Sequence, residues 1–168
     1  MKVTNRSTSA VGYELEELKV RRNFAPNETK DIPTKELETL YQQDGGYNLL
    51  RDYLMVSDKP WMEKHFAGAP IEYFWTVDDI KKSLFEDSKE LFEETLDYAP
   101  EGVLDIIKDL AWRLPISDMN KVAAIRDKLG FDVLAAIEHM KPKTAPPSEA
   151  TVEAPKPKPH TTSRLRKG

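Results

Sequence analysis

Polar and apolar residues alternate through the first 32 residues of the chain. Four segments either show this alternation or form a short run of β-type residues: 2–5, 11–15, 18–24 and 29–32. A period of two puts successive side chains on opposite faces of a β-strand. Pro26 and Asn27 supply turn chemistry before the last segment. We therefore expect a β-element of two to four antiparallel strands in residues 1–33. It should pack on a helix or on a partner, because so few strands are marginally stable alone.

From residue 34 onward, apolar residues recur three and four positions apart, as they do in amphipathic helices. Helices or helical turns are predicted for 34–43, 47–53, 61–66, 76–85, 88–98, 100–115, 117–129 and 131–139. The predicted N-terminal caps are Thr34, Thr76 (in a capping box with Asp79), Ser88 and Ser117. Gly130 is expected to end the helix before it. Segment 100–115 has the widest apolar face, so we expect it to be the central and most buried helix.

Three shorter features complete the predicted body. Residues 55–56 suit a brief strand, and 71–75 have the strongest β propensity in the chain. In segment 88–98, five residues form the predicted apolar stripe: Leu91, Phe92, Thr95, Leu96 and Tyr98. The fold class that follows is α+β and mostly helical. It has a β-element (1–33) in one domain with a helical body (34–140), followed by a C-terminal tail (141–168).

The C-terminal tail differs in composition from the rest of the chain. It holds six prolines, with seven Lys and Arg against two acids. Since the whole chain carries a net charge of −4 and the tail +5, residues 1–140 carry −9. The tail has too few apolar residues to offset the entropy of ordering itself, so we expect it to be extended or disordered unless it binds something. The alternation of Pro and Lys at 155–159 favours polyproline II. Three residues near its end are candidate partner-binding anchors: Arg164, Arg166 and Lys167.

Composition narrows the chemistry that the chain can support. It has no cysteine, which excludes disulfides and thiolate metal sites, and its three histidines lack the spacing of a zinc site. No apolar run suits a signal peptide or a membrane span, so we expect synthesis in a cytoplasm and no membrane contact. We expect no catalytic, cofactor-binding or metal-binding residue, and no small-molecule substrate.

Several residues have both a functional and a structural interpretation. Trp61 and Trp75 are candidate interface aromatics, although core packing would use them as well. His65, close to aromatics in sequence, is expected to be structural, and Gly45-Gly46 is expected to be a loop rather than a phosphate nest. The last two helices have helix-turn-helix spacing, but the second offers no base-reading side chain and carries two acids, so helix packing is favoured.

Three stretches resemble small virion-associated proteins encoded among the head genes of tailed bacteriophages. They are RNFAPNETKDIP (22–33), GGYNLLRDYL (45–54) and DYAPEGVLDIIKDLA (97–111), the last continuing with LPISD (114–118) and KLGFD (128–132). The resemblance implies a structural role without enzymatic activity, as a capsid decoration or minor capsid protein or in the head–tail connection. It also implies a location in the virion and partners among its other proteins, such as the major capsid, portal or neck proteins, in multiple copies.

Two other functions remain open from the residues. A nucleic-acid-associated regulator would use the basic tail for salt-dependent binding, and in a phage head the same tail could contact packaged DNA. The acidic body argues against the regulator, because only the tail would be attracted to phosphates. An enzyme of an unrecognised type would require a pocket with perturbed carboxylates.

Overall fold

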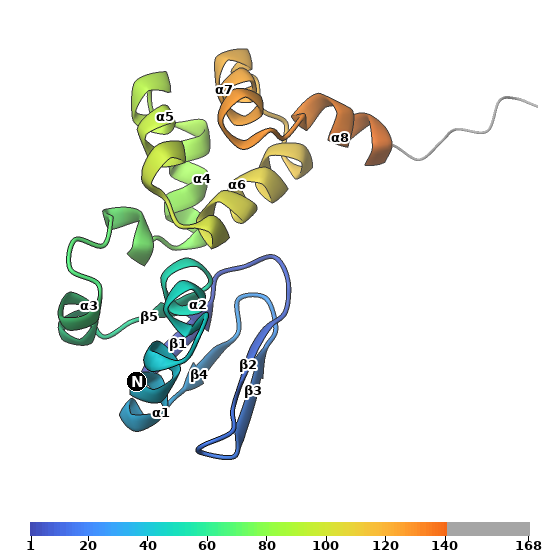
Figure 1. The fold of residues 1–168 in the computed structure, drawn as a ribbon. Coiled ribbons are helices and arrows are strands. Elements are labelled where there is room, and N and C mark those ends of the chain that lie inside the picture. Colours follow the sequence, from blue (N-terminus) through green and yellow to red (C-terminus); the bar gives the residue numbers. More distant parts are fainter. Residues whose placement is uncertain (141–168) are drawn as a thin grey trace, which may run out of the picture.

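A computed structural model describes residues 1–140 of the chain; the tail predictions, including those for Arg164, Arg166 and Lys167, lie outside the described residues. The fold is α+β and mostly helical, as predicted, with antiparallel strands at the N-terminus (Figure 1). The strands are β1 (Lys2–Asn5), β2 (Val11–Leu15), β3 (Val20–Phe24), β4 (Thr29–Asp31) and β5 (Leu54–Val56). The helices are α1 (Thr34–Gln42), α2 (Gly46–Asp52), α3 (Lys59–His65), the 3-10 helix η1 (Ile71–Phe74), α4 (Val77–Phe85), α5 (Lys89–Tyr98), α6 (Glu101–Arg113), α7 (Met119–Leu129) and α8 (Val133–Met140).

The strands form two small antiparallel sheets. One has the order β4-β1-β5, in which Val3 lies opposite both Lys30 and Val56. The other is the β2-β3 hairpin, in which Val11 pairs with Phe24. Because β5 follows α2 in the chain, the three-stranded sheet is completed by a strand from outside the first 33 residues. The predicted brief strand at 55–56 is thereby confirmed as part of β5.

The buried apolar residues form two clusters, which define two lobes (Figure 1). We call residues 1–74 the N-terminal lobe; its core packs the strands against α1, α2 and α3. Residues 75–140 form the helical lobe, whose core is built by α4 to α8. Helix α6 contacts α4, α7 and α8 within its lobe and reaches α2 in the other. The prediction that α6 is the central helix is confirmed, and it is also the helix that joins the lobes.

Two of the four predicted N-terminal caps, Thr76 and Ser88, are confirmed. The Thr76–Asp79 capping box is present in both directions, and Ser88 accepts a hydrogen bond from the Leu91 amide. Thr34 and Ser117 do not cap. Pro33 precedes α1 without any side-chain cap, and the carboxylate of Asp118, one residue after the expected position, accepts from the Asn120 amide. Gly130 ends α7 at φ 63°, a left-handed conformation that suits glycine, as predicted.

The β propensity of residues 71–75 is overridden, because this segment forms η1 and no strand. Glu72 and Tyr73 are both buried while Ile71 is exposed, so the burial does not alternate as it would along a strand. The Tyr73 hydroxyl accepts from the Val56 amide and contacts the carbonyl oxygens of Leu50 and Leu54 at 3.0 and 3.2 Å. These tertiary contacts anchor the segment to α2 and β5 through one side chain, without strand pairing.

Candidate partner-binding groove

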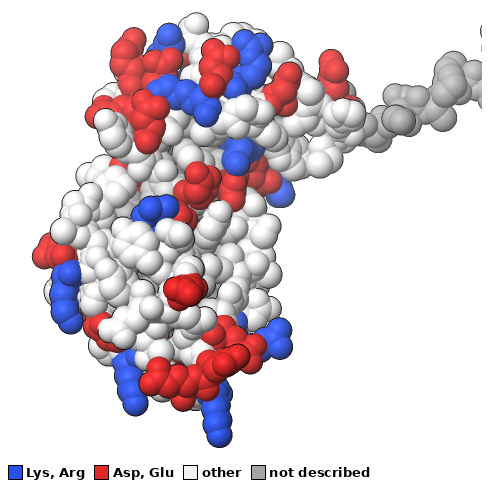
Figure 2. All heavy atoms as spheres, viewed as in Figure 1, with Lys and Arg blue, Asp and Glu red and all other residues white. Residues whose placement is uncertain are grey.

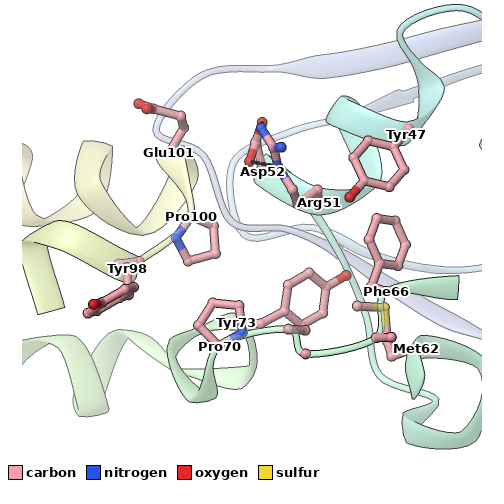
Figure 3. A pocket seen from close by; sticks show the side chains of 14 residues that line it. Tyr47, Arg51, Asp52, Met62, Phe66, Pro70, Tyr73, Tyr98, Pro100 and Glu101 are labelled. Carbon is pink, nitrogen blue, oxygen red and sulfur yellow. Dashed lines mark hydrogen bonds and ion pairs between the residues drawn. The ribbon is translucent and has the colours of Figure 1, made fainter. Parts of the chain in front are cut away.

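A cavity of about 310 Å³ opens where the two lobes meet, and we call it the inter-lobe groove (Figure 3). Helix α2 and the α3–η1 connection line it from the N-terminal lobe, and the α5–α6 junction lines it from the helical lobe. Six of its fourteen lining residues are aromatic residues or prolines: Tyr47, Phe66, Pro70, Tyr73, Tyr98 and Pro100. Tyr98 stands at one end of the groove, and Tyr47 and Phe66 stand at the other.

The floor of the groove is held by a buried arginine. The Arg6 guanidinium lies 4.1 Å from the centre of the Tyr73 ring and donates hydrogen bonds to the backbone carbonyls of Arg51, Asp52 and Tyr73. Burial lowers the pKa of Arg6 to about 10, so it remains protonated at neutral pH. Burial also raises the pKa of the Tyr73 hydroxyl. Neither group is placed to exchange a proton near pH 7, and both fix the geometry of the floor.

The walls present apolar surface to solvent. Tyr47 is 42% exposed and stacks on Phe66 with ring centres 5.0 Å apart. Tyr98, the last residue of α5, is 65% exposed. A second cavity of about 330 Å³ lies beside residues 68–70, where Ile71 is 75% exposed. The two cavities share Met62, Phe66 and residues 68–70, so they adjoin along this segment.

The rim of the groove between α2 and α6 is acidic. Arg51 pairs with Asp52 through two contacts of 2.8 Å, which neutralises much of the charge of both. Glu101, exposed at the start of α6, forms no ion pair with any residue in the described part of the chain. The pKa of nearby Tyr53 is raised by burial and then by the charges of Asp105, Glu101 and Asp52. With Arg51 and Asp52 paired, Glu101 leaves this side of the groove with one net negative charge, to which a cationic ligand group could pair.

The two tryptophans predicted at an interface are not brought together. Trp61 is 5% exposed in the core of the N-terminal lobe, where its Nε1 donates to Glu38 and its ring packs against His65 at 4.3 Å. That burial leaves it no surface to offer a partner. Trp75 is half-buried against the core of the helical lobe, and its contact with a partner stays a prediction. His65 lies 3.0 Å from Glu38, in agreement with a structural role.

Other buried polar groups are satisfied away from the groove. Glu36 of α1 accepts from Tyr13 and Arg22 of the hairpin. The Lys121 side chain belongs to a residue that is 2% exposed, and its ammonium donates to the carbonyl oxygens of Ser83 and Leu84 at 3.0 Å.

Residues 1–140 contain no group of three His, Asp or Glu side chains suited to a metal ion. Among the same residues, no helix has the length and apolar character needed to cross a bilayer. The geometry of the groove suits binding of an apolar or cationic segment.

Sequence reasoning missed the residues that form this groove, and the phase of α5 could have revealed one of them. Phe92, Thr95 and Leu96 are buried as predicted, but Leu91 and Tyr98 are exposed, so their place in the apolar stripe was wrong. Tyr98 follows Leu96 by two positions, a rotation of about 200° that turns it away from the core.

The chain matches no protein-family model, no curated protein and no solved structure.

Proposed function

We propose that the protein is a non-enzymatic structural component of a tailed-phage virion, present in several copies. It would decorate the capsid, act as a minor capsid protein or take part in the head–tail connection. Its folded body would dock on other virion proteins, and residues 141–168 would bind neighbouring subunits.

The observation that carries this proposal is the exposed apolar surface around the inter-lobe groove. Tyr47, Ile71 and Tyr98 expose large parts of their side chains there. A contiguous apolar surface with a polar rim is typical of protein–protein contact sites. Aromatic residues are the side chains most often enriched at such sites.

The sequence resemblance supports the class of partner. Two of the stretches that resemble virion-associated proteins, 45–54 and 97–111, line the groove from opposite lobes. They supply Tyr47 on one side and Tyr98 and Pro100 on the other. The resemblance and the groove therefore rest on the same residues.

Charge distribution supports a role for the tail in attachment. The helical lobe carries fifteen Asp and Glu against eight Lys and Arg, a net of −7, while the tail carries +5. Figure 2 shows many of these acids on the surface of the helical lobe. A basic segment from one copy would be attracted to the acidic surface of another.

Mass spectrometry of purified particles, with copy number set against the major capsid protein, tests the proposal. Tens to hundreds of copies would support decoration, and about a dozen would point to the neck or portal, because copy number follows the symmetry of the assembly. Absence from particles would overturn the proposal. Salt-dependent DNA binding that is lost on removal of the tail would then favour the nucleic-acid-associated alternative.

Deletion of residues 141–168 is a second test. We expect the body to keep its circular dichroism spectrum and unfolding midpoint, because both cores lie within residues 3–133. Occupancy of the truncated protein in particles should fall below that of the full chain when both are expressed at equal levels. Equal occupancy would contradict a role for the tail in attachment.

A further inference from the structure

We propose that the inter-lobe groove binds the Pro-Lys-Pro-Lys-Pro segment (155–159) of the tail of a second copy of this chain. The groove offers the exposed rings of Tyr47 and Tyr98 to an extended apolar segment, and Glu101 at its edge offers a carboxylate to a cation. The inference deepens the proposed function by naming the contact between copies, and it rests on that function only in requiring more than one copy.

The lining of the groove matches the requirements of a polyproline ligand. Grooves lined by aromatic side chains bind proline-rich segments, because the rings pack against the flat proline surfaces and the ligand is already extended. Here the exposed rings of Tyr98 and Tyr47 stand at opposite ends of the cavity, and the buried rings of Phe66 and Tyr73 support them from behind (Figure 3). Three of these four rings come from the N-terminal lobe, and Tyr98 comes from the helical lobe.

Charge complementarity favours this occupant among apolar segments. Lys156 and Lys158 alternate with the prolines. Glu101, on the rim, has no cationic partner among residues 1–140, whereas Arg51 is already paired with Asp52. A segment that brings a lysine beside Glu101 would therefore gain an ion pair without breaking one.

The position of the tail favours a second copy as its source. The tail follows α8, which lies on the opposite side of the molecule from α3 and η1 (Figure 1). The 14 residues 141–154 separate α8 from the segment. Such a chain spans about 20 Å on average as a coil and about 43 Å as polyproline II. A compact body of 140 residues is about 37 Å across, so the segment would reach the wall of its own groove formed by α3 and η1 only with a nearly extended connection. A neighbouring groove requires no such path around the body.

Paramagnetic relaxation between two copies of the full chain tests the proposal. The chain has no cysteine, so Ser163→Cys places one nitroxide near the segment. An unlabelled chain carrying this nitroxide is mixed with unmodified ¹⁵N-labelled chain, so that only contacts between copies broaden the observed amide signals. We expect intensity loss at the amide signals of groove-lining residues, namely Gly68, Ala69, Tyr98, Ala99 and Glu101.

Two matched variants connect the signal to the groove. Replacing Pro155, Pro157 and Pro159 with Ala in the nitroxide-bearing chain keeps every charge and should abolish the broadening. Tyr98→Ala in the ¹⁵N-labelled chain should also abolish it. Leu91→Ala, on the same helix and 55% exposed, should leave it unchanged. Since Tyr98 and Leu91 are both exposed, neither change should unfold the protein.

Three results would overturn the proposal. Broadening at the groove that appears only when the nitroxide is on the ¹⁵N-labelled chain itself would place the tail on its own body. Broadening spread over the acidic helical lobe that survives the proline replacements would make the contact purely electrostatic. Absence of broadening at the groove would show that the segment of a second copy does not bind there. Each result is obtained without particles, so it is independent of whether the protein is found in virions.

Discussion

Removal of the Glu36 carboxylate should detach the β2-β3 hairpin from α1. Glu36 is 4% exposed and accepts hydrogen bonds from the Tyr13 hydroxyl at 2.6 Å and from two Arg22 nitrogens at 2.9 Å each. Tyr13 comes from β2 and Arg22 from β3, so one carboxylate holds both strands. An isolated two-stranded hairpin is marginally stable, and this contact supplements the burial of its apolar side chains.

The expected cost of Glu36→Ala is about 3 kcal/mol in the free energy of unfolding. Most of it comes from the buried Tyr13 hydroxyl, since a buried group left without a partner costs about 1–3 kcal/mol. Arg22 contributes less, because its side chain is 36% exposed and water can replace the carboxylate. An exposed ion pair is worth about 0–1 kcal/mol.

Urea unfolding followed by circular dichroism measures this difference. Tyr13→Phe should cost about 1 kcal/mol alone but should restore about 1–2 kcal/mol in the Glu36→Ala background, because it removes the buried hydroxyl that has lost its partner. Glu14→Ala, on the exposed face of β2, is the matched control and should lie within about 0.5 kcal/mol of wild type. Equal stability of Glu36→Ala and Glu14→Ala would refute the reasoning.

The same carboxylate should make stability depend on pH. Hydrogen bonds from Arg22 lower the pKa of Glu36, and this effect exceeds the opposing effect of burial. A carboxylate with a lowered pKa in the folded state stabilises fully above its unfolded pKa of about 4.3 and loses that contribution as the pH falls through the folded pKa. The stability difference between wild type and Glu36→Ala should therefore be constant near neutral pH and shrink in acid. A difference that grows in acid would contradict this sign.

Two further predictions concern the lobe junction and a helix cap. Gly102→Ala should destabilise by about 1–3 kcal/mol in urea unfolding, because an added Cβ would lie 2.7 Å from the Asp52 carbonyl oxygen and 2.8 Å from that of Arg6. Gly130→Ala, where the Cβ meets nothing within 4 Å, should show only the backbone cost of φ 63°, about 1 kcal/mol. Thr76→Ala should lower the free energy of unfolding by about 1 kcal/mol through loss of the capping box, and Thr76→Ser should restore most of it.

Features that depend on neighbours in sequence were predictable. The strands of the first 31 residues and the caps at Thr76 and Ser88 follow from local period and local hydrogen bonding, and the structure confirms them. The central position of α6 was also predictable, because a wide apolar face can be buried only by packing on several sides.

Features that depend on distant residues were not predictable. The η1 conformation is set by Tyr73 contacts with Leu50, Leu54 and Val56, which lie 17 to 23 residues earlier in the chain. The burial of Glu36 depends on a hairpin that supplies Arg22 from 14 residues away. An acid in the first turn of a helix is equally well explained by the helix dipole, so its sequence context does not reveal a buried partner.

The inter-lobe groove is preformed because α6 of the helical lobe packs closely on the backbone that Arg6 holds together in the N-terminal lobe. Arg6 ties the end of β1 to backbone carbonyls of α2 and η1. Gly102 lets α6 approach the same backbone closely, since any larger side chain would meet the carbonyl oxygens of Arg6 and Asp52. The separation between Tyr98 on one lobe and Phe66 on the other is thereby set before any ligand binds. A preformed groove and an extended proline-rich ligand both reduce the entropy lost on association, so a short segment can bind there with few contacts.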